Sequence, residues 1–246
     1  MNIRQALEER KRPLVLDGGF GTMVQRYGLK EEDFRGYRYR DIPGMLLGNN
    51  EMLNLTRPDV VCEIYSAYVG AGVDILTANT FSANSISQAE YNCQHLVAEM
   101  NREAVRLARR AFADSGREGF VIATVGPTNK SLSISPDIND PACRAITFDQ
   151  LAKAYIGQME VLAQEGVDAI LLETVFDTLN AKAGIYAMQE VMQRTGKDIP
   201  LMLSATVNDT SGRLLSGQTL EAFLISVSHA PLLSIGLNCS FGADQM

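Results

Sequence analysis

The sequence is poor in the residues that most often build redox and nucleophilic sites. It contains no tryptophan, two histidines and four cysteines in 246 residues. The cysteines are far apart and none belongs to a CxxC pair, which excludes a dithiol motif and a compact zinc motif. So few cysteines in a long chain without an export signal are typical of reduced thiols, and we expect a cytoplasmic location. The four are Cys62, Cys93, Cys143 and Cys239.

Long apolar runs and an excess of positive charge are also missing. No apolar segment approaches the roughly 20 residues that span a bilayer. The first residues, MNIRQALEERKRP, contain no apolar core of a signal peptide. The formal net charge of −7 argues against nucleic acid or an anionic membrane as a partner.

What the sequence does contain is a repeated alternation of short apolar runs and amphipathic segments. The runs are nearly continuous in apolar character, as expected of strands that are covered on both faces in a parallel sheet. Between them, residues 97–111 have helical periodicity, and Thr147 and Gln150 have the spacing of a capping box. Pro58 suits the first turn of a further helix, and Gly166 suits a left-handed helix end. The six runs begin at Leu14, Asp74, Phe120, Ala169, Leu201 and Ser234.

Repeated β–α units fit either a doubly wound sheet or a (β/α)8 barrel. Small or polar residues end every apolar run, and in a barrel all strand ends converge on one functional face. A doubly wound sheet would concentrate them at a single crevice. We therefore predict one TIM-type (β/α)8 barrel domain over residues 1–246, with about six of the eight βα units present. The strand-end residues are Asp17, Asn79, Thr80, Thr128, Asn129, Glu173, Thr174, Asn208, Asp209, Asn238 and Cys239.

Two of these strand ends carry carboxylates that suit a zwitterionic ligand. Asp17 is followed by Gly18 and Gly19 in LDGGFGT, so bare backbone N–H groups lie beside a negative charge. The alternative is a tight turn in which Asp17 caps a helix. Glu173 ends an apolar strand, where an unpaired carboxylate is costly, so it needs a ligand ammonium or, alternatively, an internal salt bridge. Asp177 has a plainer explanation as a helix N-cap.

Cys239 is the one cysteine at a strand end. A lone cysteine is often a small buried hydrophobe, whereas an enzymatic zinc ion takes three protein ligands and an open position. The two histidines, His95 and His229, fall on helical segments and do not complete such a site. No histidine lies at a strand end, so a Ser–His–Asp or Cys–His apparatus is unsupported.

Several stretches of the sequence are long and distinctive. They are LVLDGGFGTMVQ, TANTF, GPTNKSLSISPDINDPACRAITFDQL, LLETVFDTLNAKA and GLNCSFG. Together, and in this order along essentially the whole chain, they resemble the homocysteine S-methyltransferase family. The sequence pattern is closer to the homocysteine-binding module of cobalamin-dependent methionine synthases than to the methyltransferases that use betaine or S-methylmethionine.

This resemblance implies a barrel that binds homocysteine and zinc at its C-terminal face. The metal would hold the substrate sulfur as a thiolate, because a Lewis acid lowers a thiol pKa. The thiolate would accept a methyl group from methylcobalamin, supplied by methyltetrahydrofolate, and both are bound by other modules of the full-length enzyme. Cys239 maps onto the first of three zinc cysteines, and Asn238 onto a neighbour that orients the site. The amino-acid end of homocysteine maps onto Asp17, Gly18, Gly19 and Glu173.

The sequence departs from the family pattern at one point. The other two zinc cysteines of the family follow the eighth strand, and no counterpart is found here, so we expect an incomplete metal site and no methyl transfer by this chain alone. Two alternatives stay open: a betaine- or S-methylmethionine-dependent enzyme, and a non-catalytic barrel remnant used for binding.

Overall fold

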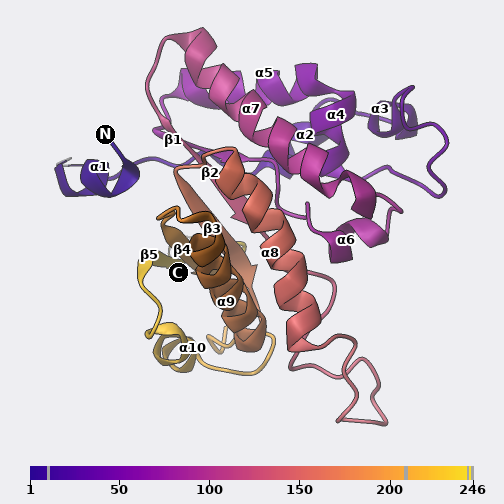
Figure 1. Cartoon of the computed structure of the whole chain (residues 1–246), viewed down its shortest axis with the longest axis vertical. Coiled ribbons are helices and arrows are strands. Elements are labelled where there is room, and N and C mark those ends of the chain that lie inside the picture. The colour runs from indigo at the N-terminus through magenta and orange to yellow at the C-terminus, as the bar shows by residue number, and fades with distance from the viewer. Residues whose placement is uncertain (10–11, 208–209, 243, 245–246) are drawn as a thin grey trace.

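The computed structural model describes residues 1–9, 12–207, 210–242 and 244. Its centre is a parallel sheet of five strands in the order β1-β2-β3-β4-β5, which is also their order along the chain (Figure 1). Each strand is mostly apolar, and β2 is buried along its whole length. The strands are β1 (Ile75–Ala78), β2 (Phe120–Val125), β3 (Ala169–Val175), β4 (Leu201–Ala205) and β5 (Leu232–Leu237).

The first of the six predicted strands is present only as a short extension of this sheet. Leu16 forms a single parallel bridge with Ile75, and the backbone around Val15 and Asp17 hydrogen-bonds to the start of β1. The other five predicted strands are confirmed within a few residues. The segment before Asp17 therefore lies where the strand preceding β1 belongs, and it ends beside the first residues of β1.

The strand order decides between the two predicted architectures. A doubly wound sheet reverses its strand order at a switch point, whereas a barrel adds each strand beside the preceding one. Here the order never reverses, which favours the barrel-type arrangement. Among the described residues the sheet is not closed, because β5 pairs only with β4 and the Leu16 segment only with β1. The complete (β/α)8 barrel is therefore not present in the described chain.

Local sequence explains where the helices begin and end. Pro58 occupies the first turn of α5, and Thr147 and Gln150 form the predicted capping box of α8. Gly166, just beyond α8, has φ of +71°, a conformation that glycine adopts without strain. The helices are α1 (Ile3–Glu9), α2 (Phe20–Gln25), α3 (Glu31–Arg35), α4 (Leu53–Thr56), α5 (Pro58–Ala71), α6 (Ser85–Ala89), α7 (Val97–Ser115), α8 (Phe148–Gln164), α9 (Thr178–Thr195) and α10 (Leu220–Val227), with short 3-10 turns η1 (Asn50–Met52) and η2 (Gln94–Leu96).

Different helices pack against the two faces of the sheet. The larger apolar core lies between the sheet and helices α5, α7, α8 and α9, and Figure 1 shows α8 and α9 in front of the strands. On the other face, a smaller cluster joins Ile75, Phe120 and Ala169 to Ile3 and Ala6 of α1. These strand residues lie at or near strand beginnings, so α1 covers that end of the face and leaves the C-terminal ends open.

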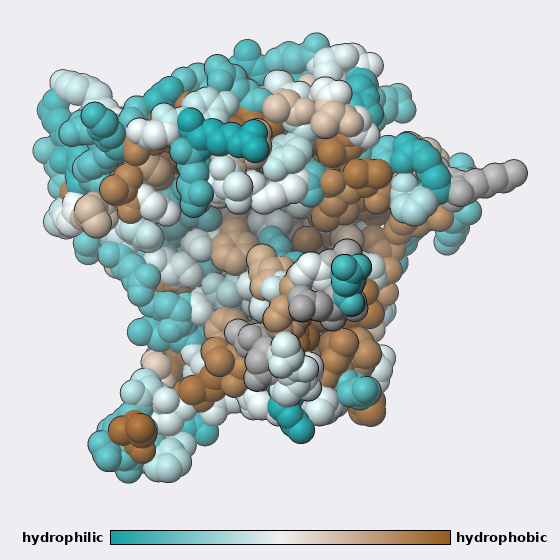
Figure 2. Space-filling view, turned by 180° about the vertical axis from the view of Figure 1, so that it is seen from behind, coloured by the Kyte–Doolittle hydropathy of each residue, from teal (hydrophilic) through white to brown (hydrophobic). Residues whose placement is uncertain are grey.

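The strand at the far edge is the least covered. Its residues Ser234, Ile235 and Gly236 are exposed, and apolar side chains are visible around the hollow on the face opposite to that of Figure 1 (Figure 2). No helix of the described residues is both long and apolar enough to cross a membrane.

Candidate functional site

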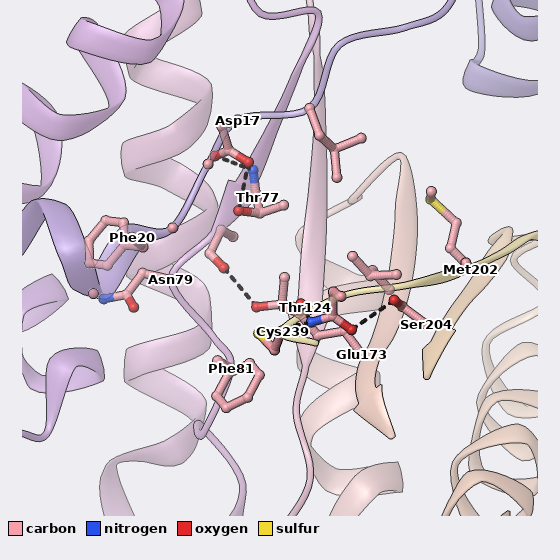
Figure 3. A pocket seen from close by; sticks show the side chains of 18 of the residues that line it. Asp17, Phe20, Thr77, Asn79, Phe81, Thr124, Glu173, Met202, Ser204 and Cys239 are labelled. Atoms are coloured by element: carbon pink, nitrogen blue, oxygen red, sulfur yellow. Dashed lines mark hydrogen bonds between the residues drawn. The ribbon is translucent and has the colours of Figure 1, made fainter. Parts of the chain in front are cut away.

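A cavity of about 660 Å³ opens at the C-terminal ends of the strands. It is lined by residues of the Leu16 segment and of all five strands, together with loops that follow them (Figure 3). The strand-end residue Asn79 lies in its lining, and so do all six residues that were predicted to bind the ligand or the metal, although the segments that carry them are far apart in the chain. The six are Asp17, Gly18, Gly19, Glu173, Asn238 and Cys239. Asn208 and Asp209 lie outside the described residues.

Asp17 enters the cavity from the end of the first segment. Its two oxygens accept hydrogen bonds from the backbone N–H and the hydroxyl of Thr77, each at 2.9 Å. Burial nevertheless raises the pKa of Asp17 from 3.8 to about 6, because desolvation outweighs these bonds. The helix-cap alternative for this residue is wrong, since Gly19 occupies the N-cap of α2.

Glu173 enters the same cavity from β3. Burial, together with the negative charge of Asp17, raises the pKa of its carboxyl from 4.5 to about 7. One oxygen, Oε2, accepts a hydrogen bond from Nδ2 of Asn238 at 3.0 Å. Within the described ranges no lysine or arginine pairs with it, so the internal salt bridge is not found there. Among the residues that the structure describes, neither Asp17 nor Glu173 thus has a cationic side chain as a partner.

Asn238 connects Glu173 with the thiol of Cys239. Its Oδ1 accepts hydrogen bonds from the backbone N–H of Thr174 at 3.0 Å and the hydroxyl of Ser204 at 2.7 Å. Its Nδ2 lies 3.3 Å from the Cys239 sulfur. Cys239 is exposed, so the interpretation of this cysteine as a small buried hydrophobe is wrong.

The two glycines of the first turn leave backbone exposed at the cavity wall. A Cβ atom at Gly18 would lie 2.9 Å from the hydroxyl of Tyr68, closer than real contacts allow. Gly19 caps α2 without any side-chain hydrogen bond. Side chains therefore do not shield this stretch, and a ligand carboxylate can approach its N–H groups.

Several residues of this cavity were not predicted from the sequence. Thr77 and Ser204 lie inside strands, where polar residues in an apolar run gave only a weak signal. Glu51 lies in the long connection between residues 26 and 56, and no motif marks it. It is 5% exposed, accepts a hydrogen bond from the N–H of Ser82 at 2.8 Å, and has a pKa raised by burial.

The zinc ion that the resemblance implies needs three protein ligands. Across the described part of the chain no group of three or more histidine, cysteine, aspartate or glutamate side chains could hold a metal ion. Cys62 lies in α5 and Cys93 is buried, so neither accompanies Cys239. His95 lies in a helical turn as predicted, whereas His229 lies in the turn after α10, not on a helix. The residues described here do not by themselves fit a zinc site.

A family model and two solved structures that are similar to this chain all concern homocysteine methyltransferases. A family model described as homocysteine S-methyltransferase matches residues 14–246. The oxidized form of the homocysteine methyltransferase MmuM from Escherichia coli superposes with a TM-score of 0.71 and 18% identity, covering 96% of this chain and 76% of that one. Its metallated form gives a TM-score of 0.72 and 18% identity, covering 99% and 80%. At this identity the two structures show a shared fold.

Proposed function

The chain belongs to the homocysteine S-methyltransferase family, and on that premise we propose that it is the homocysteine-binding barrel of a methionine synthase. In this proposal the sulfur of homocysteine accepts a methyl group from methylcobalamin, which is recharged by methyltetrahydrofolate. Other modules of the enzyme bind these two donors. The closer resemblance of the loop sequences to cobalamin-dependent enzymes favours this donor over betaine and S-methylmethionine.

One observation carries the substrate assignment: Asp17 and Glu173 line one cavity, and no described residue forms an ion pair with either. Both have raised pKa values because burial disfavours their charged forms. A ligand ammonium would relieve that cost by pairing with them. An amino acid supplies such a group, and the exposed Gly18 and Gly19 backbone offers N–H donors for its carboxylate.

The sulfur end of the ligand would then extend toward Cys239. This residue lines the same cavity, next to the Asn238 carboxamide that hydrogen-bonds to Glu173. Cys239 stays a predicted zinc ligand. Because the described residues do not supply two more ligands beside it, we assign no step of the reaction to a metal here.

The substrate assignment is tested by isothermal titration of L-homocysteine into the wild-type chain and into Asp17→Asn and Glu173→Gln. Loss of one charge-assisted contact in a buried site is expected to weaken binding by roughly tenfold or more. Asp198→Asn is the matched control, because that carboxylate has a side chain that is 82% exposed and does not line the cavity. Equal affinity in all four proteins would contradict the proposed site.

The donor is tested separately on the natural gene product that contains this sequence. Methionine formation is measured with homocysteine and, in parallel, methylcobalamin, betaine or S-methylmethionine. Turnover with methylcobalamin supports the methionine-synthase assignment. Turnover with betaine or S-methylmethionine alone would overturn that assignment and leave the family membership intact.

A further inference from the structure

Thr174 has an unusual backbone beside the site. Its φ is +57°, a left-handed conformation that is a genuine outlier for a β-branched residue. The pairing of β3 with β4 shifts register at the same place, between Leu172 and Val175. Such strained positions persist where surrounding contacts hold them, and they cluster at functional sites. Thr174 is not among the residues that line the cavity, so any role must act through a neighbour.

That neighbour is the carboxamide of Asn238. Thr174 presents its backbone N–H to one end of the amide at 3.0 Å. A backbone N–H can only donate, so the amide atom facing it must be the oxygen. The NH2 end must then face the other way. There it lies 2.8 Å from the Thr174 hydroxyl oxygen, 3.0 Å from Glu173 Oε2 and 3.3 Å from the Cys239 sulfur.

Cys239 shares the strained geometry. Its φ is +51°, and its sulfur lies 3.9 Å from the Thr174 hydroxyl. Two non-glycine residues in the left-handed region therefore flank one amide. A purely structural bulge would not require both residues to contact the same carboxamide, or that carboxamide to contact a cavity carboxylate.

We propose that Thr174 is a positioning residue. Its left-handed backbone and its hydroxyl fix the orientation of the Asn238 carboxamide, an arrangement that we call the clamp. The NH2 group of that amide then contacts Glu173 and Cys239 and orients both side chains toward the cavity. The inference rests on the proposed function, because it assumes that Glu173 receives the amino group of homocysteine. In this proposal the strained backbone conformation of Thr174 serves ligand binding and not the stability of the fold.

Three substitutions separate these roles. Thr174→Gly removes the hydroxyl and suits the positive φ, Thr174→Val keeps the branched shape without a hydroxyl, and Thr174→Ser keeps the hydroxyl. For each we would measure the melting temperature and the L-homocysteine Kd, beside Glu173→Gln. Thr174→Gly is expected to melt no lower than wild type and yet to bind roughly tenfold more weakly. Thr174→Val should also bind more weakly, and Thr174→Ser should bind within about twofold of wild type.

The outcomes distinguish the positioning role of Thr174 from the proposed substrate site. If Glu173→Gln weakens binding while Thr174→Gly and Thr174→Val bind as wild type does, the clamp is wrong and the proposed substrate site stands. If the wild-type chain does not bind homocysteine, or Glu173→Gln binds equally well, the proposed function fails and the clamp fails with it. A loss of affinity only in variants that also melt lower would assign Thr174 a structural role and overturn the inference.

Discussion

Glu173→Gln is expected to stabilise the ligand-free protein at high pH and to have little effect at low pH. The pKa of Glu173 is raised from 4.5 to about 7, so the folded state holds a proton that the unfolded state releases. Stability due to this group is therefore present below about pH 4.5 and falls as the pH rises to about 7. At about 1.4 kcal/mol per pH unit the full loss is roughly 3 kcal/mol. Because the side chain is only partly shielded from solvent, we expect about 2 kcal/mol.

The assay is urea denaturation of both proteins at pH 5 and pH 8, with and without saturating L-homocysteine. Without ligand, the free energy of unfolding of Glu173→Gln relative to wild type should increase by about 1.5 kcal/mol between the two pH values, because part of the loss has already occurred at pH 5. Homocysteine should stabilise wild type more than the variant at pH 8, because its ammonium pairs with the ionised carboxylate. Asp198→Asn should show no such change. A wild-type protein that gains stability relative to Glu173→Gln as the pH rises would refute the reasoning.

Three further predictions concern shape and strain at the cavity. Gly18→Ala places a Cβ atom 2.9 Å from the Tyr68 hydroxyl, so homocysteine titration should give weaker binding with a melting temperature close to wild type, since the ring end can move. Gly126→Ala places a Cβ atom 2.7 Å from the Phe81 ring, and urea denaturation should register a loss of roughly 1–3 kcal/mol; no loss would mean that the ring shifts freely. Cys239→Gly relieves a φ of +51° and should raise the free energy of unfolding by up to about 1 kcal/mol, whereas Cys239→Ala should not.

Much of the secondary structure could be predicted because its causes are local. The apolar runs became strands, Thr147 and Gln150 formed their capping box, and Asp177 caps α9 through the N–H of Leu179. The first strand was overestimated, since the segment around Leu16 makes only one bridge. Nothing in its composition distinguishes it from the others. The difference is one of pairing, since among the described residues this segment pairs with β1 at a single bridge.

The sequence by itself determined the parallel β–α order and the position of Asp17, Glu173 and Cys239 at strand ends, because strand ends and glycine turns follow from patterns only a few residues long. The family followed from the resemblance of several stretches along the chain. Tertiary structure alone decided the rest. Whether Asp17 and Glu173 share one desolvated space depends on the strand order, which sets their environment and hence their raised pKa values. The Asn238 carboxamide oxygen accepts hydrogen bonds from the backbone N–H of Thr174, 64 residues away in the chain, and from the hydroxyl of Ser204 on β4. Such long-range contacts have no local signature, because they arise only when separate strands are brought side by side.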